Sequence, residues 1–193
     1  MNLLISVGAI VGIVAAVVVV LALIIWVISA HNKFVQMDNQ CESAFHNIDI
    51  YLKKRYDLIP NIVNTVKGYA KHESETLQNV IDARSRAQSA STPEEKIEAN
   101  AALSKSIRSF NMVMERYPEL RANTNFMDLQ SQLKSIEGEL ANVRKYYNAT
   151  VEQFNKNIRT FPSSIVASCM GLKKKSYFEL DDIEERRNVK VEF

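Results

Sequence analysis

Turn-forming residues are scarce in this sequence of 193 residues, which has five glycines and four prolines. So few of them do not supply the many tight connections that an all-β fold needs. The two cysteines, Cys41 and Cys169, are too few for a disulfide framework. The 24 basic residues nearly balance the 22 acidic ones, so the basic excess typical of a nucleic-acid-binding protein is absent. We therefore expect an all-α chain with no nucleic-acid partner.

Charged side chains are also missing from the first 32 residues, and Lys33 is the first one in the chain. Residues 3–28 are an apolar run that forms a helix about 39 Å long, enough to cross a bilayer with some tilt. A cleaved signal peptide is the alternative. It is disfavoured because the run exceeds the length of a signal core and no basic residue precedes it. The sequence therefore predicts a retained transmembrane anchor over residues 1–30.

The residues flanking this run predict its orientation. Lys33 follows it and no basic side chain precedes it, so the positive-inside rule favours an outer N-terminus and a cytoplasmic bulk. Trp26 suits the aromatic belt at the membrane interface. The two cysteines, which do not make a disulfide framework, are compatible with a reducing compartment. The lipid bilayer is thus the first expected partner.

Small residues inside the apolar run form a pattern known from paired membrane helices. Gly8 and Gly12 are four positions apart, and Ala15 and Ala16 extend the same small surface. Such a surface lets two helices approach closely in lipid. The alternative is that glycine and alanine are simply common in membrane helices. We hypothesise that these four residues pack membrane helices together.

Beyond the anchor, apolar residues recur every three or four positions, as on one face of a helix. The first such stripe is Phe34, Met37, Cys41, Ala44, Ile48 and Tyr51. Neither glycine nor proline separates it from the apolar run, so anchor and stripe are predicted to form one helix. A second helix is predicted from Asp57, with Pro60 in its first turn and Ile62, Val66, Tyr69, Leu77, Val80, Arg84 and Ala87 on its apolar face. Alternatively, Pro60 lies inside a helix that begins earlier.

Two further helices have clear starts. Thr92, Pro93 and Glu95 form a capping-box pattern, and the helix that follows is predicted to end before Pro118. The last stripe runs from Phe126 to Phe161 through Leu129, Leu133, Ile136, Leu140, Val143, Tyr147, Val151, Phe154 and Ile158, with Asn125 and Asp128 as the predicted cap. Asn123, Asn125, Asn148 and Asn155 near this helix are interpreted as caps and inter-helix hydrogen bonds. We expect an antiparallel four-helix bundle of long, coiled-coil-like helices continuous with the anchor.

Three segments carry a resemblance to a known family. They are RYDLIPNIVNTVKGYAKHE at residues 55–73, YPELRANTNF at residues 117–126 and YNATVEQFNKNIRTFP at residues 147–162. In sequence and in their order along the chain, these segments resemble the motifs of the bacterial LemA family. The resemblance implies a short outer N-terminus, one helix in the bacterial cytoplasmic membrane and a helical bundle, and it implies no agreed activity. Glu152 departs from the pattern, because the family commonly has a basic residue there.

Motifs of enzymes and metal sites are not found. The three histidines, His31, His46 and His72, lack the spacing of a helical zinc site. Cys41 lies on the apolar stripe, which predicts a buried, inert thiol. Glu137 and Glu139 are two positions apart and do not face each other on a helix. Nucleophile elbows, phosphate-binding loops and dinucleotide fingerprints are also missing. We expect neither catalysis nor a cofactor.

Two classes of function remain: a scaffold that self-associates in the cell envelope, and an adaptor or regulator of a partner such as a membrane protease or sensor. Apolar residues off the stripes are the candidate interaction surface: Val35, Ile50, Leu52, Ile59, Val63, Ile81 and Met112. They either form a second surface, favouring a homo-oligomer, or widen one core. The predicted domains are the anchor (1–30), the bundle (31–165) and a tail (166–193). Residues 173–193 carry no net charge and are predicted to be a disordered end.

Overall fold

The structure, a computed structural model, describes the backbone of residues 2–178 and the side chains from Val7 onward. Every regular element within these residues is an α-helix, so the all-α prediction is confirmed. The chain divides into two compact units. In the described residues, the first unit comprises 2–43 and 150–175, and the second comprises 44–149 and 176–178. The predicted division at residues 30 and 165 stays a prediction.

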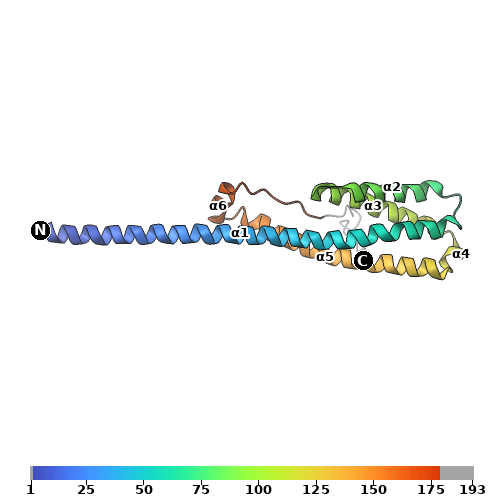
Figure 1. Ribbon diagram of the computed structural model, residues 1–193, viewed down its shortest axis with the longest axis horizontal. Coiled ribbons are helices and arrows are strands. Elements are labelled where there is room, and N and C mark those ends of the chain that lie inside the picture. Colours follow the sequence, from blue (N-terminus) through green and yellow to red (C-terminus); the bar gives the residue numbers. More distant parts are fainter. Residues whose placement is uncertain (1, 179–193) are drawn as a thin grey trace, which may run out of the picture. The chain divides into compact units, whose positions relative to one another are not determined.

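Helix α1 extends from Asn2 to Lys67 without a break (Figure 1), which confirms that the apolar run and the first stripe share one helix. It is the one described helix that is long and apolar enough to cross a membrane, and its apolar part is not buried. Since Pro60 lies inside α1, the prediction of a new helix near Asp57 is wrong and the alternative is correct.

A specific contact accommodates Pro60. Proline has no N–H, so it cannot donate the usual helical hydrogen bond to the carbonyl of the fourth residue before it, here Tyr56. In the structure Nε of Arg84 donates to the Tyr56 carbonyl at 2.6 Å. Arg84 was predicted to lie on the apolar face of its helix; instead Ala83 is buried there and Arg84 satisfies the backbone of α1.

The helices of the second unit start and stop at local signals. Helix α2 covers Ser74–Ser89, and residues 68–73 separate it from α1, a break that the predicted second helix did not include. Helix α3 covers Pro93–Met114, and its capping box is confirmed: Thr92 Oγ1 accepts from the N–H of Glu95, whose carboxylate accepts from the N–H of Thr92.

The last helices differ from the prediction at their ends. A short α4, Pro118–Arg121, precedes α5, Thr124–Asn157, and α6 covers Ser163–Cys169. The predicted cap Asn125 lies within α5; the capping side chain is Asn123, which accepts from the N–H of Phe126 at 3.0 Å. Helix α5 ends before the predicted stop at Pro162, which is preceded by a cis peptide bond.

The first unit has a small apolar core where α6 packs against α1. Phe34 from α1 and Val166 and Ala167 from α6 are buried together. Trp26 and Ala30 pack against this cluster, as do Ile158, Met170 and Leu172. Trp26 therefore contacts the protein itself, in addition to suiting the predicted interface position.

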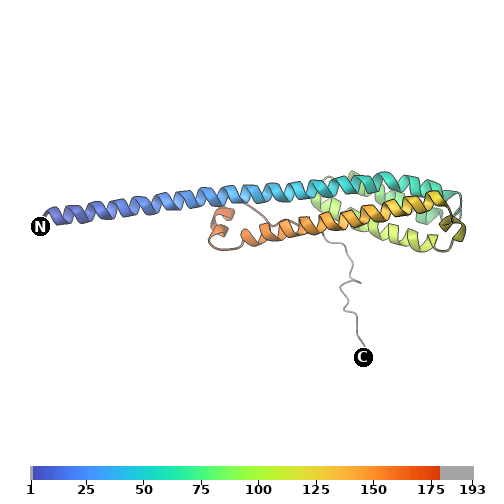
Figure 2. The ribbon, with the colours of Figure 1, turned by 90° about the horizontal axis from the view of Figure 1, so that it is seen from below.

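In the second unit α1, α2, α3 and α5 lie side by side (Figures 1 and 2). Side-chain contacts join α1 to each of the others: Tyr56 with Arg84 on α2, Tyr56 with Asn100 on α3, and Arg55 with Glu137 on α5. Along α5, Leu133 and Leu140 are fully buried, whereas Ile136 and Val143 are half-buried.

The buried stripe of α1 differs from the predicted one after Ile48. It continues through Leu52, Arg55, Ile59, Ile62 and Val66 rather than ending on Tyr51, which is half-buried. As a correction, Leu52, Ile59 and Val63 belong to the core and do not form an interaction surface, since each is 2% exposed or less. A stripe wider than one row of residues is what a helix with several neighbours requires.

Residues 172–178 have no regular secondary structure, yet they are held by side chains. We call them the extended segment. In the first unit Lys175 forms an ion pair with Asp38 at 2.7 Å. In the second unit Phe178 is buried. The prediction of a disordered end is thus wrong for residues 173–178, and residues 179–193 lie outside the described part of the chain.

Candidate functional site

Two arginine side chains are buried in the second unit, Arg55 on α1 and Arg144 on α5, and we call them the buried arginine pair. Only 1% of Arg55 and 5% of Arg144 is exposed. Nε of Arg55 lies 2.7 Å from Oε1 of Glu137, without an aligned N–H···O hydrogen bond. Buried charges are costly unless they are paired and hydrogen-bonded. We therefore take the surroundings of these two side chains as the candidate functional site among the described residues.

A small polar network joins the pair to α3. Nη2 of Arg55 donates to Oγ of Ser104 at 2.9 Å, and Ser104 in turn donates to the backbone carbonyl of Asn100. The Asn100 amide donates to the Tyr56 hydroxyl at 2.7 Å. Asn100 and Ser104 are both buried polar residues. Adjacent residues of α1 thus contact one polar face of α3.

This network leaves several buried donors unpaired. Nη1 of Arg55 and both Nε and Nη2 of Arg144 have no hydrogen-bond partner among the described residues. The guanidinium of Arg144 instead lies 4.6 Å from the ring centre of Phe178, a cation–π contact. Unpaired buried donors are rare in folded proteins and each calls for a physical reason.

The pKa values of the two arginines are lowered first by burial and then by neighbouring positive charge. Burial, and after it the positive charge of Arg55, lowers the pKa of Arg144 to about 10, and Glu137 opposes the shift. Burial also lowers the pKa of Arg55, with Glu137 opposing it and Arg108 adding to it. Burial raises the pKa of Tyr56 and outweighs its hydrogen bond to Asn100. The carboxylate of Glu137 therefore acts on two buried cations.

A cavity of about 790 Å³ lies beside Arg55. Its lining comes from α1, α3, α4 and α5 and includes Arg55, Ser104 and Glu137. Three further cationic side chains line it: Arg108, Arg121 and Lys134. The remaining charged residue in the lining is Glu115, so four positive side chains face two negative ones. This cavity is the best candidate for a ligand site in the described residues.

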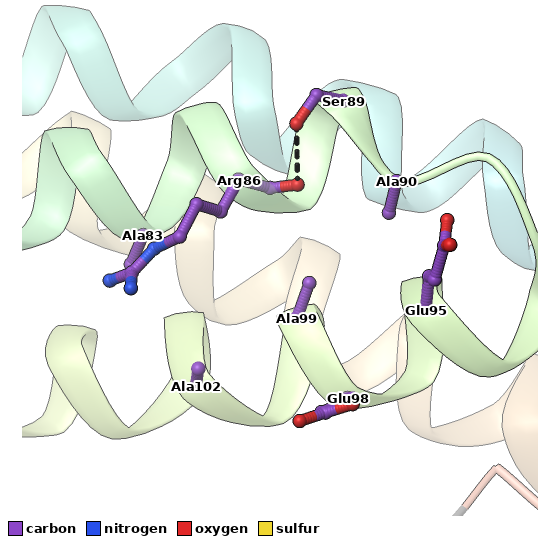
Figure 3. Close-up of a pocket in the computed structure, with 8 residues that line it drawn as sticks. All are labelled: Ala83, Arg86, Ser89, Ala90, Glu95, Glu98, Ala99 and Ala102. Atoms are coloured by element: carbon purple, nitrogen blue, oxygen red, sulfur yellow. Dashed lines mark hydrogen bonds between the residues drawn. The ribbon is translucent and has the colours of Figure 1, made fainter.

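A second cavity, of about 390 Å³, lies between α2 and α3 (Figure 3). Small side chains form most of it: Ala83, Ala90, Ala99 and Ala102. Two of its polar side chains already have structural roles. Glu95 belongs to the capping box of α3, and Ser89 donates to the backbone of Arg86. This cavity follows from close alanine packing between two helices.

The predicted membrane-packing residues lie on the apolar part of α1. Gly8, Gly12, Ala15 and Ala16 are helical and exposed. A β-carbon at Gly8 or Gly12 has no neighbouring atom within 4 Å. The chain itself thus leaves this face open, and the packing hypothesis stays a prediction.

The predicted interaction residues are divided by burial. Val35, Ile50 and Met112 are exposed, at 42%, 54% and 64%, and Ile81 is half-buried. Leu52, Ile59 and Val63 are core residues, as described above. Only the first four remain available for contact with another molecule.

Sequence analysis missed the buried arginine pair because neither arginine lies on a predicted apolar stripe. The stripe through Tyr51 placed Arg55 outside the core, and the stripe through Val143 excluded Arg144. A step of four residues at Ile48 or at Leu140 places both arginines in the buried row. The signal that the sequence offered was one arginine on each of these two shifted stripes, among apolar residues.

The cysteines and acidic residues form no further site. Burial raises the pKa of the Cys41 thiol, which is also hydrogen-bonded to Thr150. Its predicted burial is confirmed, and Cys169 is exposed. Among the residues that the structure describes, no group of three His, Cys, Asp or Glu side chains is placed to hold a metal ion.

The architecture defines an all-α protein, and the apolar part of α1 suggests a single membrane crossing. Residues 44–193 match the sequence model of the LemA family, so the chain belongs to that family. It is similar to Protein LemA of Metamycoplasma hominis, with 23% identity over 154 residues, 79% of this chain and 70% of that protein. It is also similar to Magnetosome protein MamQ 2 of Paramagnetospirillum magneticum, with 21% identity over 86% of this chain and 71% of the relative.

Proposed function

We propose that this protein is a non-enzymatic scaffold that is anchored in a membrane by α1 and self-associates there. The observation that carries the proposal is the continuity of α1, whose exposed apolar part passes without a break into residues of both units. Because one helix serves as anchor and as core element, pairing of anchors is transmitted to the helical domain. The names of the relatives, LemA and MamQ, do not denote a catalysed reaction.

The contacts of the second unit support an antiparallel four-helix bundle as its architecture. Asp49 pairs with Lys96 and Tyr56 with Asn100, so α1 and α3 run in the same direction. Phe45 contacts Tyr147 whereas Arg55 contacts Glu137, so α1 and α5 run in opposite directions. These directions are those of up-down-up-down connections.

Self-association is supported by the open small-residue face of α1. In lipid, helices associate through close packing of small residues, and the membrane raises the effective concentration of weak additional contacts. Ile50, which is exposed on α1 in the second unit, is the candidate for such a contact. The bilayer and a second copy of the chain are therefore the proposed partners.

The test is the mass of the full chain in nanodiscs, together with crosslinking in intact membranes. We expect a homo-oligomer that is weakened by Gly12→Leu and by Ile50→Glu. Val14→Leu adds apolar bulk on the opposite side of the same helix and serves as the matched control. A monomer mass under all conditions, without crosslinks in membranes, would contradict the scaffold.

An adaptor for an envelope protein is the second candidate, favoured by exposed methionines on the second unit. Met112 and Met127 are both more than half exposed, and methionine side chains adapt to varied partner surfaces. A monomeric chain that crosslinks to one membrane protease or sensor, through photoreactive groups placed at these two positions, would support the adaptor.

We also propose that the two units lie on the cytoplasmic side of the bacterial cytoplasmic membrane. The proposal rests on Lys33 and on the absence of basic side chains before the apolar run. The exposed thiol of Cys169 is a natural reporter, since Cys41 is buried. A membrane-impermeant maleimide should label Cys169 only after the cells are permeabilised. Labelling of Cys169 in intact cells would show that the two units lie on the outer side of the membrane and would contradict the proposal.

A further inference from the structure

The cavity beside Arg55 combines three features that are seldom found together. It is large, its charged lining has an excess of positive side chains, and that lining includes Arg55, which is 99% buried. Arg55 already uses Nη2 for Ser104 and Nε for the ion pair with Glu137, whereas Nη1 has no partner. A buried guanidinium N–H without a partner is a strong donor that has not been used.

Negative charge is short at this position. Glu137 is the acidic residue that acts on both buried arginines, and its side chain is 35% exposed. Repulsion between Arg55 and Arg144 and the proximity of Arg108 to Arg55 increase the imbalance. An anion in the cavity relieves this imbalance, because its negative charge attracts the buried guanidinium groups.

We propose that the cavity binds an oxyanion of the phosphate class, held by Arg55 and by the rim cations Arg121 and Lys134. The planar fork of arginine matches the oxygens of a phosphate group. The lining also contains Gln130, whose side-chain amide can donate a hydrogen bond to a phosphate oxygen. Apolar walls formed by Ile107 and Phe126 provide space for a small organic group attached to the phosphate.

Two sources supply this chemistry: a soluble phosphate ester and a phospholipid headgroup. Both present the same charged oxygens, so the structure assigns the chemical class and the experiment separates the sources. The binding site is independent of the proposed self-association, since none of its residues lies on the small-residue face of α1.

The experiment uses the full chain in nanodiscs of zwitterionic phosphatidylcholine. Thermal unfolding is measured against inorganic phosphate and glycerol phosphate, with chloride at matched ionic strength as the reference. A parallel arm replaces part of the lipid with phosphatidylglycerol and adds no soluble ligand. We expect a saturable rise in melting temperature with soluble phosphate or with the anionic lipid, and the arm that responds identifies the source.

Variants at the rim separate a site from general ionic effects. The double variant Arg121→Gln/Lys134→Gln changes exposed side chains and should raise the dissociation constant about tenfold or more, the loss expected for charge-assisted contacts. Lys105→Gln/Lys145→Gln removes the same charge from exposed positions of α3 and α5 outside the cavity and should leave binding unchanged.

The variant Glu137→Gln should strengthen the response to phosphate, whereas the rim variant should weaken it. Glu137→Gln removes the carboxylate that competes for the buried arginines, so the response to inorganic phosphate should be larger than in the unmodified chain. The proposal is overturned if neither arm stabilises the chain beyond chloride. It is equally overturned if the rim variant and the control pair respond alike, which would show an adventitious ion only.

Discussion

Asn148 binds both backbone polar groups of Phe178. Its side-chain nitrogen donates to the Phe178 carbonyl at 3.2 Å, and its side-chain oxygen accepts the Phe178 N–H at 2.8 Å. A carboxamide has donors and an acceptor side by side, so it matches one residue of extended backbone. In the first unit Asn155 binds Lys175 in the same way, with both distances at 2.9 Å. The extended segment is therefore held largely through its backbone.

Asn148→Ala tests this arrangement. The variant removes two hydrogen bonds of about 1 kcal/mol each, so Phe178 should leave its buried position more often. We expect the amide hydrogen of Phe178 to exchange about tenfold faster or more, measured by hydrogen exchange on the full chain. Asn142→Ala, an exposed asparagine of the same helix, is the matched control. Unchanged exchange in Asn148→Ala would show that side-chain burial alone holds Phe178.

The extended segment shows what sequence analysis could not predict. Residues 173–178 contain three lysines and no periodicity, which are features of a solvated end. Their order depends on Asn148 and Asn155, which lie about 20 to 30 positions earlier. Both asparagines were interpreted as caps or as inter-helix hydrogen-bonding residues. Their spacing of seven positions places them on one face of a helix, but it does not indicate that their partner is an extended segment of backbone.

The helices were predictable where local signals decide the outcome. The capping box at Thr92 depends on neighbouring residues only and is confirmed. The continuity of α1 was predictable up to Tyr51, since the apolar run and the first stripe have no breaker between them. Beyond that point Pro60 indicated a boundary, but the helix continues through it, and Arg84 donates to the Tyr56 carbonyl that proline leaves without its helical donor.

The candidate site was not predictable to the same degree. Arg55 and Arg144 lie on separate helices, and their proximity requires the packing of α1 against α5. A predicted apolar stripe contains about one residue per helical turn. The choice between adjacent positions such as Tyr51 and Leu52 therefore decides whether Arg55 is predicted to lie in the core or at the surface. Periodicity alone does not make that choice, because both alternatives fit a helix.

Leu140→Ala should strongly destabilise the second unit. Leu140 has no exposed surface, and truncation of a fully buried leucine costs about 2–5 kcal/mol. Chemical unfolding of the full chain in detergent measures this loss. Glu139→Ala changes the adjacent exposed residue of α5 and should lie within about 0.5 kcal/mol of the unmodified chain. Equal effects of the two variants would mean that α5 presents a different face to the core.

Glu95 predicts an acid-dependent contribution to stability. Hydrogen bonds from the N–H groups of Ser91 and Thr92 lower the pKa of its carboxyl from the ordinary 4.5. Because the folded pKa lies below the unfolded one, the stabilisation is present above about pH 4.5 and is lost as the pH falls through the folded pKa. Glu95→Gln should thus lower the melting temperature more at about pH 7 than at about pH 3.

Glu98→Gln is the control for Glu95, since it removes an exposed carboxylate from the same helix without affecting the cap. Its melting temperature should follow that of the unmodified chain at both pH values. A pH-independent effect of Glu95→Gln would mean that the neutral amide replaces the carboxylate fully in the capping box.

The contact between Arg84 and Tyr56 is testable through Pro60. Arg84→Met removes the donor to the Tyr56 carbonyl and leaves a partly buried acceptor unpaired, at a cost of about 1 kcal/mol. In a Pro60→Ala background, the introduced alanine supplies the N–H that proline lacks. The cost of Arg84→Met should then fall by about 1 kcal/mol, a coupling that a double-mutant cycle measures from unfolding free energies. Arg86→Met, at an exposed position of α2, should cost the same in both backgrounds. Additive effects of Arg84→Met and Pro60→Ala would show that another donor satisfies this carbonyl and that α1 tolerates Pro60 for a different reason.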